Sequence, residues 1–318
     1  MKTRILIKEG EYRLAKAGVM DAKIDAEELY CFACNCDKVV MFLRKEEEAD
    51  KDVEEKYLEL IERRASRIPL QHITGEQEFM GFRFKVTPDV LIPRQDTETL
   101  VTEAVKTIRQ ESERAAEEMK KASIFRKLRR RQCFEVLDLC CGSGSVGISL
   151  SRMLDTVSVS GTDISLPALK LAAANAALNR AKVEFFQGDM FDAVPEGRRV
   201  TAEGLSARAK GTKTGQFDMI VSNPPYIRSS IIPLLQEEVK KHEPIEALDG
   251  GRDGLDFYRT IVKQAHQRLK PEGWLLLEIG YDQGEELRKM IKDSGFYSPA
   301  TVVKDLPGRD RVVKCRKK

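Results

Sequence analysis

The sequence predicts an α/β fold, in which an open, mostly parallel sheet carries helices on both faces and is joined to a small N-terminal helical domain. Two observations support this prediction. Between residues 134 and 294, short apolar segments alternate with stretches of helical periodicity, a rhythm typical of a doubly wound sheet. From about Tyr12 to Ser66, apolar residues recur at helical spacing instead. The length of 318 residues suits two domains.

The composition excludes several broad classes of protein. An apolar fraction of 42% supports a sizeable core and excludes wholesale disorder. No stretch approaches the ~20 apolar residues that span a bilayer, and the first residues lack the apolar core of a signal peptide, so no membrane association is expected. A net charge of +3 argues against a large phosphate-binding surface. Seven cysteines are an odd number, and a chain of this size needs no disulfides. We therefore expect a cytoplasmic protein.

Three consecutive regions are expected along the chain. Pro69 interrupts the helical pattern, and Ile73 to Val86 then alternates around two glycines like a pair of strands. The helix that follows is expected to begin near Thr97, with Asp96 as its cap. The expected boundaries are 1–70 for the helical domain, 71–95 for a linking β-hairpin and 96–318 for the sheet domain.

The sheet domain is expected to contain strands and helices in alternation. The strands expected first are Phe134–Leu139, Val157–Thr162, Val183–Phe186, Phe217–Ser222 and Trp274–Ile279. The helices expected among them are Val146–Leu154, Leu166–Asn179, Gly254–Leu269 and Gln283–Ser294. Ala300–Lys304 and Arg311–Lys314 flank a Pro-Gly turn and should form an antiparallel hairpin that closes the sheet. In such sheets the ligand lies beyond the carboxyl ends of the strands.

Two polar segments interrupt this pattern. The segment 109–131 is highly charged and ends in the basic run Arg126–Arg131. Such a run can bind nucleic acid, but a solvated extension of the preceding helix is the favoured interpretation. The segment 196–216 is rich in Gly, Arg, Lys and Thr and is expected to be a mobile surface loop.

Two sets of residues that often bind metals are present without metal-like spacing. Cys31, Cys34 and Cys36 form a C-x-x-C-x-C cluster, but no histidine lies near it and no fourth cysteine completes a zinc pattern. Buried thiols on a helix are the favoured interpretation, and no metal site is expected. The histidines, too scattered to form a site and interpreted as structural, are His72, His242 and His266.

A glycine-rich turn follows the first strand of the sheet. Gly142 and Gly144 would let the backbone turn tightly and approach a ligand at the next helix N-terminus. From Gly142 to Gly147 the pattern is G-x-G-x-x-G, which is weak evidence alone because several nucleoside-binding sheets use it. Asp163 ends the second strand, where its carboxylate can accept hydrogen bonds from both ribose hydroxyls of either NAD or S-adenosylmethionine.

The most informative motif is Asn223-Pro224-Pro225-Tyr226, directly after the fourth strand. The prolines fix the backbone and remove two N–H donors, which leaves carbonyl acceptors exposed. The Asn223 side-chain oxygen and the Pro224 carbonyl can together bind both hydrogens of one planar –NH2 group, with Tyr226 as an aromatic wall. Methyl transfer to an amide or amine needs such a site, whereas hydride transfer needs a nicotinamide pocket that nothing here indicates. The alternative hypothesis, that the protein is an NAD oxidoreductase, is therefore supported by the G-x-G-x-x-G pattern alone.

The Asn-Pro-Pro-Tyr tetrapeptide is shared by amino-methyltransferases acting on adenine, guanine and protein glutamine. Across most of its length the chain further resembles the glutamine-N5 methyltransferases of peptide chain release factors, the HemK or PrmC family. The stretches that carry this resemblance are Pro69–Gly75, Phe84–Arg94, Ala247–Tyr258 and Gly308–Val313.

The resemblance implies a Rossmann-like class I methyltransferase domain with a seven-stranded sheet, a small helical domain and a linking hairpin. It also implies S-adenosylmethionine as methyl donor and the glutamine of the release factor Gly-Gly-Gln loop as acceptor. Separately, we expect no direct nucleic-acid substrate and a monomer. The implied catalytic residues, which would hold the glutamine amide, are Asn223, Pro224, Pro225 and Tyr226. The implied cofactor-binding or neighbouring residues are Cys140, Cys141, Gly142, Ser143, Gly144, Asp163, Asp189, Met190, Asn223, Phe79, Pro93 and Arg94. Asp189 and Met190 would contact the adenine.

The sequence departs from the pattern of that family at three positions. Cys140 stands where a glycine is usual, so the backbone there must tolerate a Cβ. Met190 stands where an aromatic residue is common, and Gln95 interrupts the usual Pro-Arg-Pro run. None of the three lies in the Asn-Pro-Pro-Tyr motif.

Other functions share parts of this pattern. A nucleic-acid amino-methyltransferase would use the same loops, but it normally needs a wider basic face than a charge of +3 provides. A methyltransferase acting on a ribosomal-protein glutamine is closer and harder to distinguish. A non-catalytic adaptor would not need the acceptor pair at all.

Overall fold

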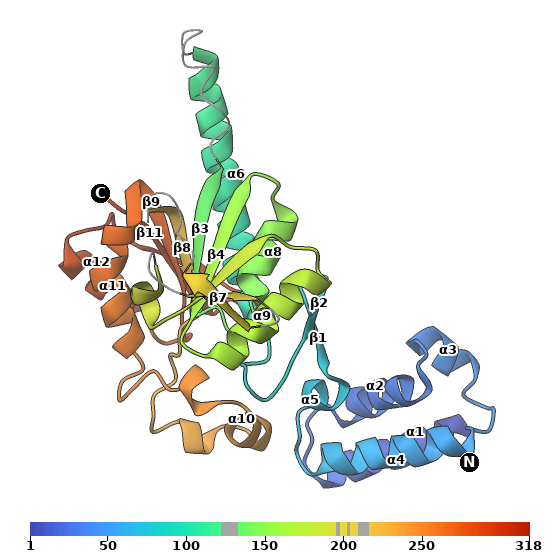
Figure 1. Cartoon of the computed structure of the whole chain (residues 1–318). Helices are drawn as coiled ribbons and strands as arrows, with labels where there is room; N and C mark the ends of the chain where they lie inside the picture. Colours follow the sequence, from blue (N-terminus) through green and yellow to red (C-terminus); the bar gives the residue numbers. More distant parts are fainter. Residues whose placement is uncertain (122–132, 195–197, 202–203, 209–215) are drawn as a thin grey trace. The chain divides into compact units, whose positions relative to one another are not determined.

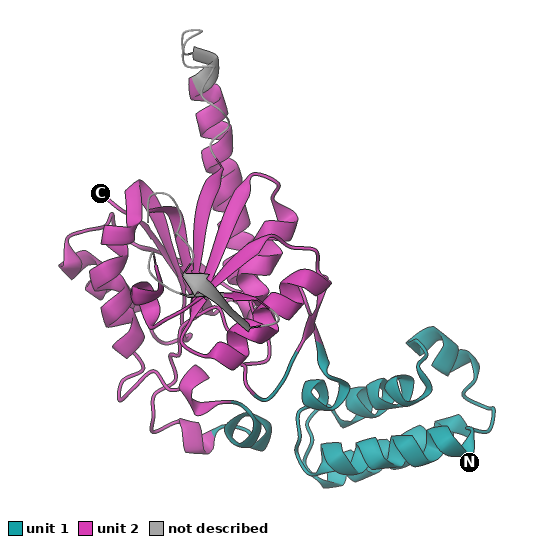
Figure 2. Cartoon of the chain, viewed as in Figure 1, with its two compact units in different colours: residues 1–76, 86–88, 235–243 teal, residues 77–85, 89–234, 244–318 magenta. Residues whose placement is uncertain are grey.

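The computed structural model describes residues 1–121, 133–194, 198–201, 204–208 and 216–318. The chain divides into two compact units, coloured teal and magenta in Figure 2. Unit 1 comprises Met1–Glu76, Val86–Pro88 and Leu235–Glu243. Unit 2 comprises Gln77–Lys85, Asp89–Leu234 and Pro244–Lys318. Within the described residues, no helix has the length and apolar character needed to cross a membrane.

Unit 1 is helical, as the spacing of its apolar residues predicts. Its N-terminal helices are α1 (Thr3–Lys16), α2 (Ala22–Cys34), α3 (Lys38–Leu43), α4 (Lys51–Ala65) and α5 (Leu70–Thr74). Leu6, Leu14, Leu29 and Ile61 are fully buried in its core. Gly10 lets α1 approach α4 closely, because a Cβ at this position would lie 2.0 Å from the Tyr57 hydroxyl oxygen.

A short helix from late in the chain belongs to unit 1 as well. This helix, α10 (Glu237–His242), lies within the segment 235–243, which the sequence assigned to the sheet domain. Arg64 pairs with Glu238 at 3.0 Å and with Asp25 at 2.7 Å, and all three side chains are largely buried. Arg67 also pairs with Glu238. These ion pairs between residues distant in sequence group α10 with the N-terminal helices in unit 1.

Unit 2 begins with a β-hairpin and a long helix. The hairpin pairs β1 (Glu76–Phe79) with β2 (Phe82–Lys85), although Glu76 itself counts with unit 1. A 3-10 turn, η1 (Gln95–Thr97), leads into α6 (Glu98–Lys121). The helix that was expected to extend into the segment 109–131 does so through Lys121, and the basic run Arg126–Arg131 lies outside the described residues.

One sheet forms the centre of unit 2. Its strands are β3 (Phe134–Leu139), β4 (Val157–Asp163), β5 (Val183–Gln187), β6 (Arg198–Thr201), β7 (Gly204–Arg208), β8 (Phe217–Ser222), β9 (Leu269–Glu278), β10 (Thr301–Lys304) and β11 (Asp310–Arg316). The strand order is β10-β11-β9-β8-β3-β4-β5-β6-β7. The five central strands are parallel, and β10 and β11 pair in antiparallel fashion at one edge. This is the expected α/β class.

Helices cover both faces of the sheet, with α6, α8 (Ser145–Met153) and α9 (Leu166–Leu178) on one face and α11 (Asp256–Arg268) and α12 (Gly284–Ser294) on the other (Figure 1). Alternate strand residues enter the two cores. In β3, Val136 packs with the first group of helices, while Leu137 and Leu139 pack with the second. Because both faces are covered, the central strands carry runs of consecutive buried apolar residues, such as Met219–Val221 in β8 and Leu275–Leu277 in β9, and these runs are how the sequence revealed them.

The sheet has nine strands among the described residues, whereas seven were expected. All seven expected strands are present. The additional pair, β6 and β7, comes from the segment 196–216, which was expected to be a loop. Backbone pairing explains the difference: β6 runs antiparallel to β5, with Val200 opposite Phe185 and buried in the core. The polar composition of the segment concealed this edge pairing.

Candidate active site

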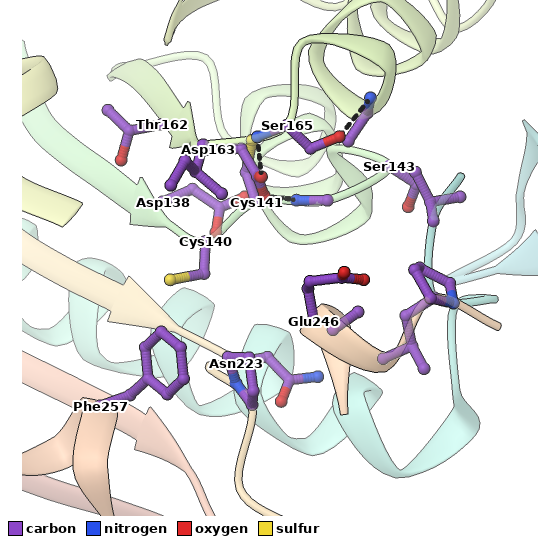
Figure 3. A pocket seen from close by; sticks show the side chains of 18 of the residues that line it. Asp138, Cys140, Cys141, Ser143, Thr162, Asp163, Ser165, Asn223, Glu246 and Phe257 are labelled. Atoms are coloured by element: carbon purple, nitrogen blue, oxygen red, sulfur yellow. Dashed lines mark hydrogen bonds between the residues drawn. The ribbon is translucent and has the colours of Figure 1, made fainter. Parts of the chain in front are cut away.

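A cavity of about 750 Å³ opens at the carboxyl ends of the parallel strands of unit 2. Its size is typical of sites for small molecules and cofactors. The turn after β3, the end of β4, the turn after β5 and the segment after β8 all contribute to its wall. In Figure 3 the side chains of Asp138 and Asp163 lie along one side of this cavity, and those of Asn223 and Phe257 lie along the other.

The glycine-rich turn between β3 and α8 follows an unusual backbone path. Cys140, Gly142 and Gly144 all have positive φ angles, of 59°, 52° and 79°. Glycine adopts such angles at little cost, whereas at Cys140 the Cβ is strained. A Cβ on Gly144 would lie 3.0 Å from Ile148 and 3.1 Å from Ala172, so this glycine also permits close packing of the helices behind the turn.

Asn175 of α9 fixes this turn from behind. Its fully buried side chain donates to the carbonyl oxygen of Ser143 at 3.1 Å. It also accepts from the Lys85 backbone N–H at 2.7 Å and donates to the Lys85 carbonyl at 3.1 Å. One carboxamide therefore joins the β-hairpin to the glycine-rich turn, which gives the hairpin a role in shaping the cavity.

Two aspartates hold the same turn from the side of the cavity. Asp163 accepts hydrogen bonds from the backbone N–H groups of Gly142 and Ser165, each at 2.9 Å. Asp138 accepts from the Gly147 N–H at 2.8 Å and is 1% exposed. Burial raises the pKa of Asp163, against the opposing effect of its backbone donors. Burial also raises the pKa of Asp138 to about 7.

The segment after β8 presents Asn223 to the cavity with a defined orientation. The Asn223 side-chain N–H donates to the Thr97 hydroxyl at 3.2 Å. Because the amide nitrogen is used in this way, the Oδ1 atom is left to accept hydrogen bonds from a ligand. The Tyr226 hydroxyl donates to Glu278 Oε1 at 3.4 Å, and burial raises the pKa of Tyr226 above its usual range.

The backbone of this segment is supported by a second glycine-rich loop. Gln283 donates through its side-chain N–H to the carbonyl oxygens of Tyr226 and Gly254, at 3.0 and 3.1 Å. Gly250 lies so close that a Cβ there would be 2.7 Å from Tyr226 Cα and 2.9 Å from the Pro225 oxygen. The Asn-Pro-Pro-Tyr segment is therefore fixed by backbone contacts as well as by its own prolines.

The electrostatic character of the cavity favours a cationic ligand. Its lining has one basic side chain, Arg94, among the described residues. The acidic residues in the lining are Asp89, Asp138, Asp163, Asp189, Glu246, Asp249 and Asp256. A concave site with this charge balance attracts positive charge. Over the described part of the chain, no cluster of His, Cys, Asp or Glu is arranged to bind a metal ion.

The structure brings most of the sequence-predicted site residues together at this cavity. Those that line it are Pro93, Arg94, Cys140, Cys141, Gly142, Ser143, Asp163, Asp189, Met190, Asn223 and Pro225. Four others are not part of the lining. Gly144 shapes the turn from behind it, and Pro224 and Tyr226 continue the backbone beside Asn223. Phe79 is 1% exposed and packs edge-to-face on Phe84 in the hydrophobic core, so its side chain is used for packing.

Sequence reasoning missed several residues that determine the geometry of the site. Thr97 orients Asn223, Glu278 contacts Tyr226, and Gln283 holds the Tyr226 backbone. Asp138, which accepts from the Gly147 N–H, was not among the predicted site residues. These residues are single polar side chains at large sequence separations, so no spacing rule could have grouped them. The one available signal was an acidic residue at or next to the end of a buried strand, at Asp138 in β3 and Glu278 in β9.

Comparisons with known proteins give consistent results. Residues 6–75 match the family model described as "PrmC N-terminal domain", and residues 119–202 match the one described as "Methyltransferase small domain". The chain is 38% identical over 300 residues to a release factor glutamine methyltransferase of Geobacter sulfurreducens, covering 94% of this chain and 91% of the relative. It is 34% identical over 317 residues to a protein of the same name from Deinococcus radiodurans, covering 100% and 99% of the two chains.

Proposed function

Because this chain belongs to the release factor glutamine methyltransferase family, we propose that it methylates the side-chain amide nitrogen (N5) of the glutamine in the Gly-Gly-Gln loop of a peptide chain release factor. The chain is a methyltransferase. S-adenosyl-L-methionine is the proposed methyl donor. The observation that carries the proposal is the orientation of Asn223, whose amide nitrogen is bound to Thr97 so that its oxygen remains available to a substrate amide.

The residues of the cavity fit this donor. S-adenosylmethionine is cationic at its sulfonium group and supplies an electrophilic methyl carbon. The charged side chains of the lining are acidic except for Arg94, which matches that positive charge. We expect Asp163, at the end of β4, to accept hydrogen bonds from the ribose hydroxyls of this donor. The backbone around Gly142 leaves space for a ligand, because a Cβ on this residue would meet no atom within 4 Å.

The proposed role of the Asn-Pro-Pro-Tyr segment is to orient the substrate amide. A glutamine amide nitrogen is a poor nucleophile because its lone pair is delocalised into the carbonyl group. Asn223 Oδ1 and the Pro224 carbonyl would accept its two hydrogens, which favours positive charge on nitrogen and directs the lone pair at the methyl carbon. Positioning of this kind can lower a barrier by up to ~7–11 kcal/mol. No nucleophilic side chain is needed.

Two alternative acceptors use the same chemistry. The names of the relatives favour a release factor over a ribosomal protein as the substrate. A nucleic-acid acceptor is not favoured by the nearly balanced charge of the chain. A cytoplasmic location, a monomeric state and the domain boundaries remain predictions.

The experiment that tests the proposal is a methylation assay with labelled S-adenosylmethionine and a purified release factor, followed by mass spectrometry. We expect one added methyl group on the glutamine of the Gly-Gly-Gln loop and none when that glutamine is replaced by alanine. A ribosomal protein, RNA and DNA serve as competing acceptors in the same assay. Methylation of any of these in preference to the release factor would refute the proposal.

A further inference from the structure

We propose that Thr97 and Glu278 form a positioning pair that fixes which end of the Asn223 carboxamide faces the substrate. The inference rests on the proposed function, because it concerns how Asn223 is presented to the glutamine amide. Neither residue is one of the proposed substrate contacts. Both are buried, with exposures of 3% for Thr97 and 1% for Glu278.

Three separate elements bring these side chains together. Thr97 ends the turn η1, Asn223 follows β8, and Glu278 ends β9. Thr97 Oγ1 lies 3.2 Å from Asn223 Nδ2, and a side-chain hydrogen bond from Thr97 lowers the pKa of the Glu278 carboxyl against the larger effect of burial. Thr97 therefore bridges a cavity residue and a buried acid that does not line the cavity.

The direction of these hydrogen bonds follows from donor and acceptor chemistry. A carboxylate can only accept, so the Thr97 hydroxyl donates its single hydrogen to Glu278. The lone pairs of Thr97 Oγ1 then accept from the Asn223 amide nitrogen. Since the nitrogen is held there, the Asn223 oxygen faces the cavity. The charge on Glu278 thus determines the orientation of an amide that it does not contact.

Glu278 has few competing partners. The Tyr226 hydroxyl donates to its Oε1 atom at 3.4 Å, and its Oε2 atom has no hydrogen-bond partner among the described residues. The Tyr258 hydroxyl donates to the Glu278 backbone carbonyl at 2.7 Å, which fixes the main chain. The charged groups that act on it are Arg311, which favours the carboxylate, and Asp96, which opposes it.

Protonation of Glu278 would reverse the arrangement. Burial, the largest effect on this residue, raises the pKa of Glu278 to about 7, so both forms are accessible near neutral pH. Once protonated, Glu278 can donate to Thr97, and the Thr97 hydroxyl can then donate to Asn223 Oδ1. That exchange turns the Asn223 amide nitrogen toward the substrate, where it would face the two N–H donors of the glutamine amide and could not accept from them. Methylation should therefore decline as the pH falls through the pKa of Glu278.

The test compares purified full-length variants in release factor methylation. Thr97→Val removes the hydroxyl but keeps the shape, and Thr97→Ser restores the hydroxyl. We expect Thr97→Val to lower kcat by about 10- to 100-fold, Thr97→Ser to stay within about threefold of the wild type, and the Kd for S-adenosylmethionine to change little. Glu278→Gln should abolish the acid limb of the kcat profile between pH 5.5 and 8.5, because its carboxamide does not titrate.

Matched controls are available on α6 of the same unit. Thr107 is buried and donates to the Glu103 carbonyl at 2.8 Å, so Thr107→Val removes an equivalent hydroxyl away from the site. Glu103 is a buried carboxylate paired with Lys314, and Glu103→Gln should keep the acid limb. A merely structural role for Thr97 would make the Thr97→Val and Thr107→Val enzymes equally active.

Each outcome supports or refutes the positioning pair. Wild-type kcat in Thr97→Val, or an unchanged acid limb in Glu278→Gln, would overturn the positioning pair while leaving the proposed function intact. A wild-type enzyme that binds S-adenosylmethionine but does not methylate a release factor would instead refute the proposed function. If Thr97→Val loses S-adenosylmethionine binding altogether, the pH profile of Glu278→Gln provides the decision.

Discussion

Cys140 and Met190 contact each other through their sulfur atoms, with Cys140 Sγ 3.7 Å from Met190 Sδ. Both line the cavity, and both have a left-handed backbone, with φ angles of 59° and 48°. They are also two of the three positions at which the sequence departs from the pattern of the family that it resembles. The two departures are therefore neighbours in space, which suggests that each residue compensates for the other.

This contact predicts coupled effects of substitution at the two positions. Met190→Phe alone should weaken S-adenosylmethionine binding, because the larger ring meets the Cys140 side chain. Cys140→Gly removes that side chain and relaxes the left-handed backbone. In the double variant we expect binding to recover, with a coupling energy of about 0.5–3 kcal/mol. Calorimetric Kd values for the four proteins measure it, and additive changes would show that the contact is unimportant.

Asn223→Ala tests the acceptor role of the side chain. We expect kcat to fall by about 10²–10³-fold, a loss similar to that for removal of one oriented hydrogen-bonding group from a transition-state site. The Kd for S-adenosylmethionine should change much less, because Asn223 lies across the cavity from Asp163. Steady-state kinetics and calorimetry on the same preparation provide the comparison. Equal losses in kcat and affinity would mean that Asn223 is chiefly a cofactor ligand.

The sheet could be predicted from the sequence because its signals are local. β3 and β8 have the predicted bounds, since each is centred on consecutive buried apolar residues, as is typical of parallel strands that are covered on both faces. The Asn-Pro-Pro-Tyr segment and Asp163 were placed at the same edge for the same reason: each directly follows or ends such a run.

Contacts between distant residues could not be predicted in this way. Asp96 was expected to cap a helix, but it lies within η1 and its carboxylate pairs with Arg311 at 3.0 Å. The role of Thr97 depends on Asn223 and Glu278, which lie far along the chain. β6 and β7 form because β5 offers an open edge, which no local composition shows.

Gly250→Ala should damage the site through the backbone. The new Cβ would lie 2.7 Å from Tyr226 Cα, so the Asn-Pro-Pro-Tyr segment would have to move. We expect a large loss of kcat together with a loss of about 1–3 kcal/mol in the free energy of unfolding. Gly295→Ala is the control, because its Cβ would meet nothing within 4 Å and only its positive φ is strained. That variant should lose some stability and keep its kcat. Equal kcat values for the two variants would contradict the prediction.

Asp138 should make stability depend on pH in a direction opposite to that of a typical surface carboxylate. Burial, the largest effect on this residue, raises its pKa to about 7, whereas in the unfolded chain the pKa of an aspartate is about 3.9. The folded protein therefore holds a proton at this residue between about pH 4 and 7 that the unfolded chain releases, and the contribution of Asp138 to the free energy of unfolding falls as the pH rises through that window.

Asp138→Asn tests this prediction, because its side chain keeps an oxygen that can accept from the Gly147 N–H but does not titrate. The free energy of unfolding of this variant minus that of the wild type should therefore be at least about 1 kcal/mol higher at pH 8 than at pH 4.5. Urea unfolding of both proteins at the two pH values measures the difference directly, and because the buried Glu278 is present in both, its own titration cancels. If the difference in stability between the two proteins stays the same at both pH values, Asp138 is ionised throughout and its carboxylate is stabilised in place by the glycine-rich turn.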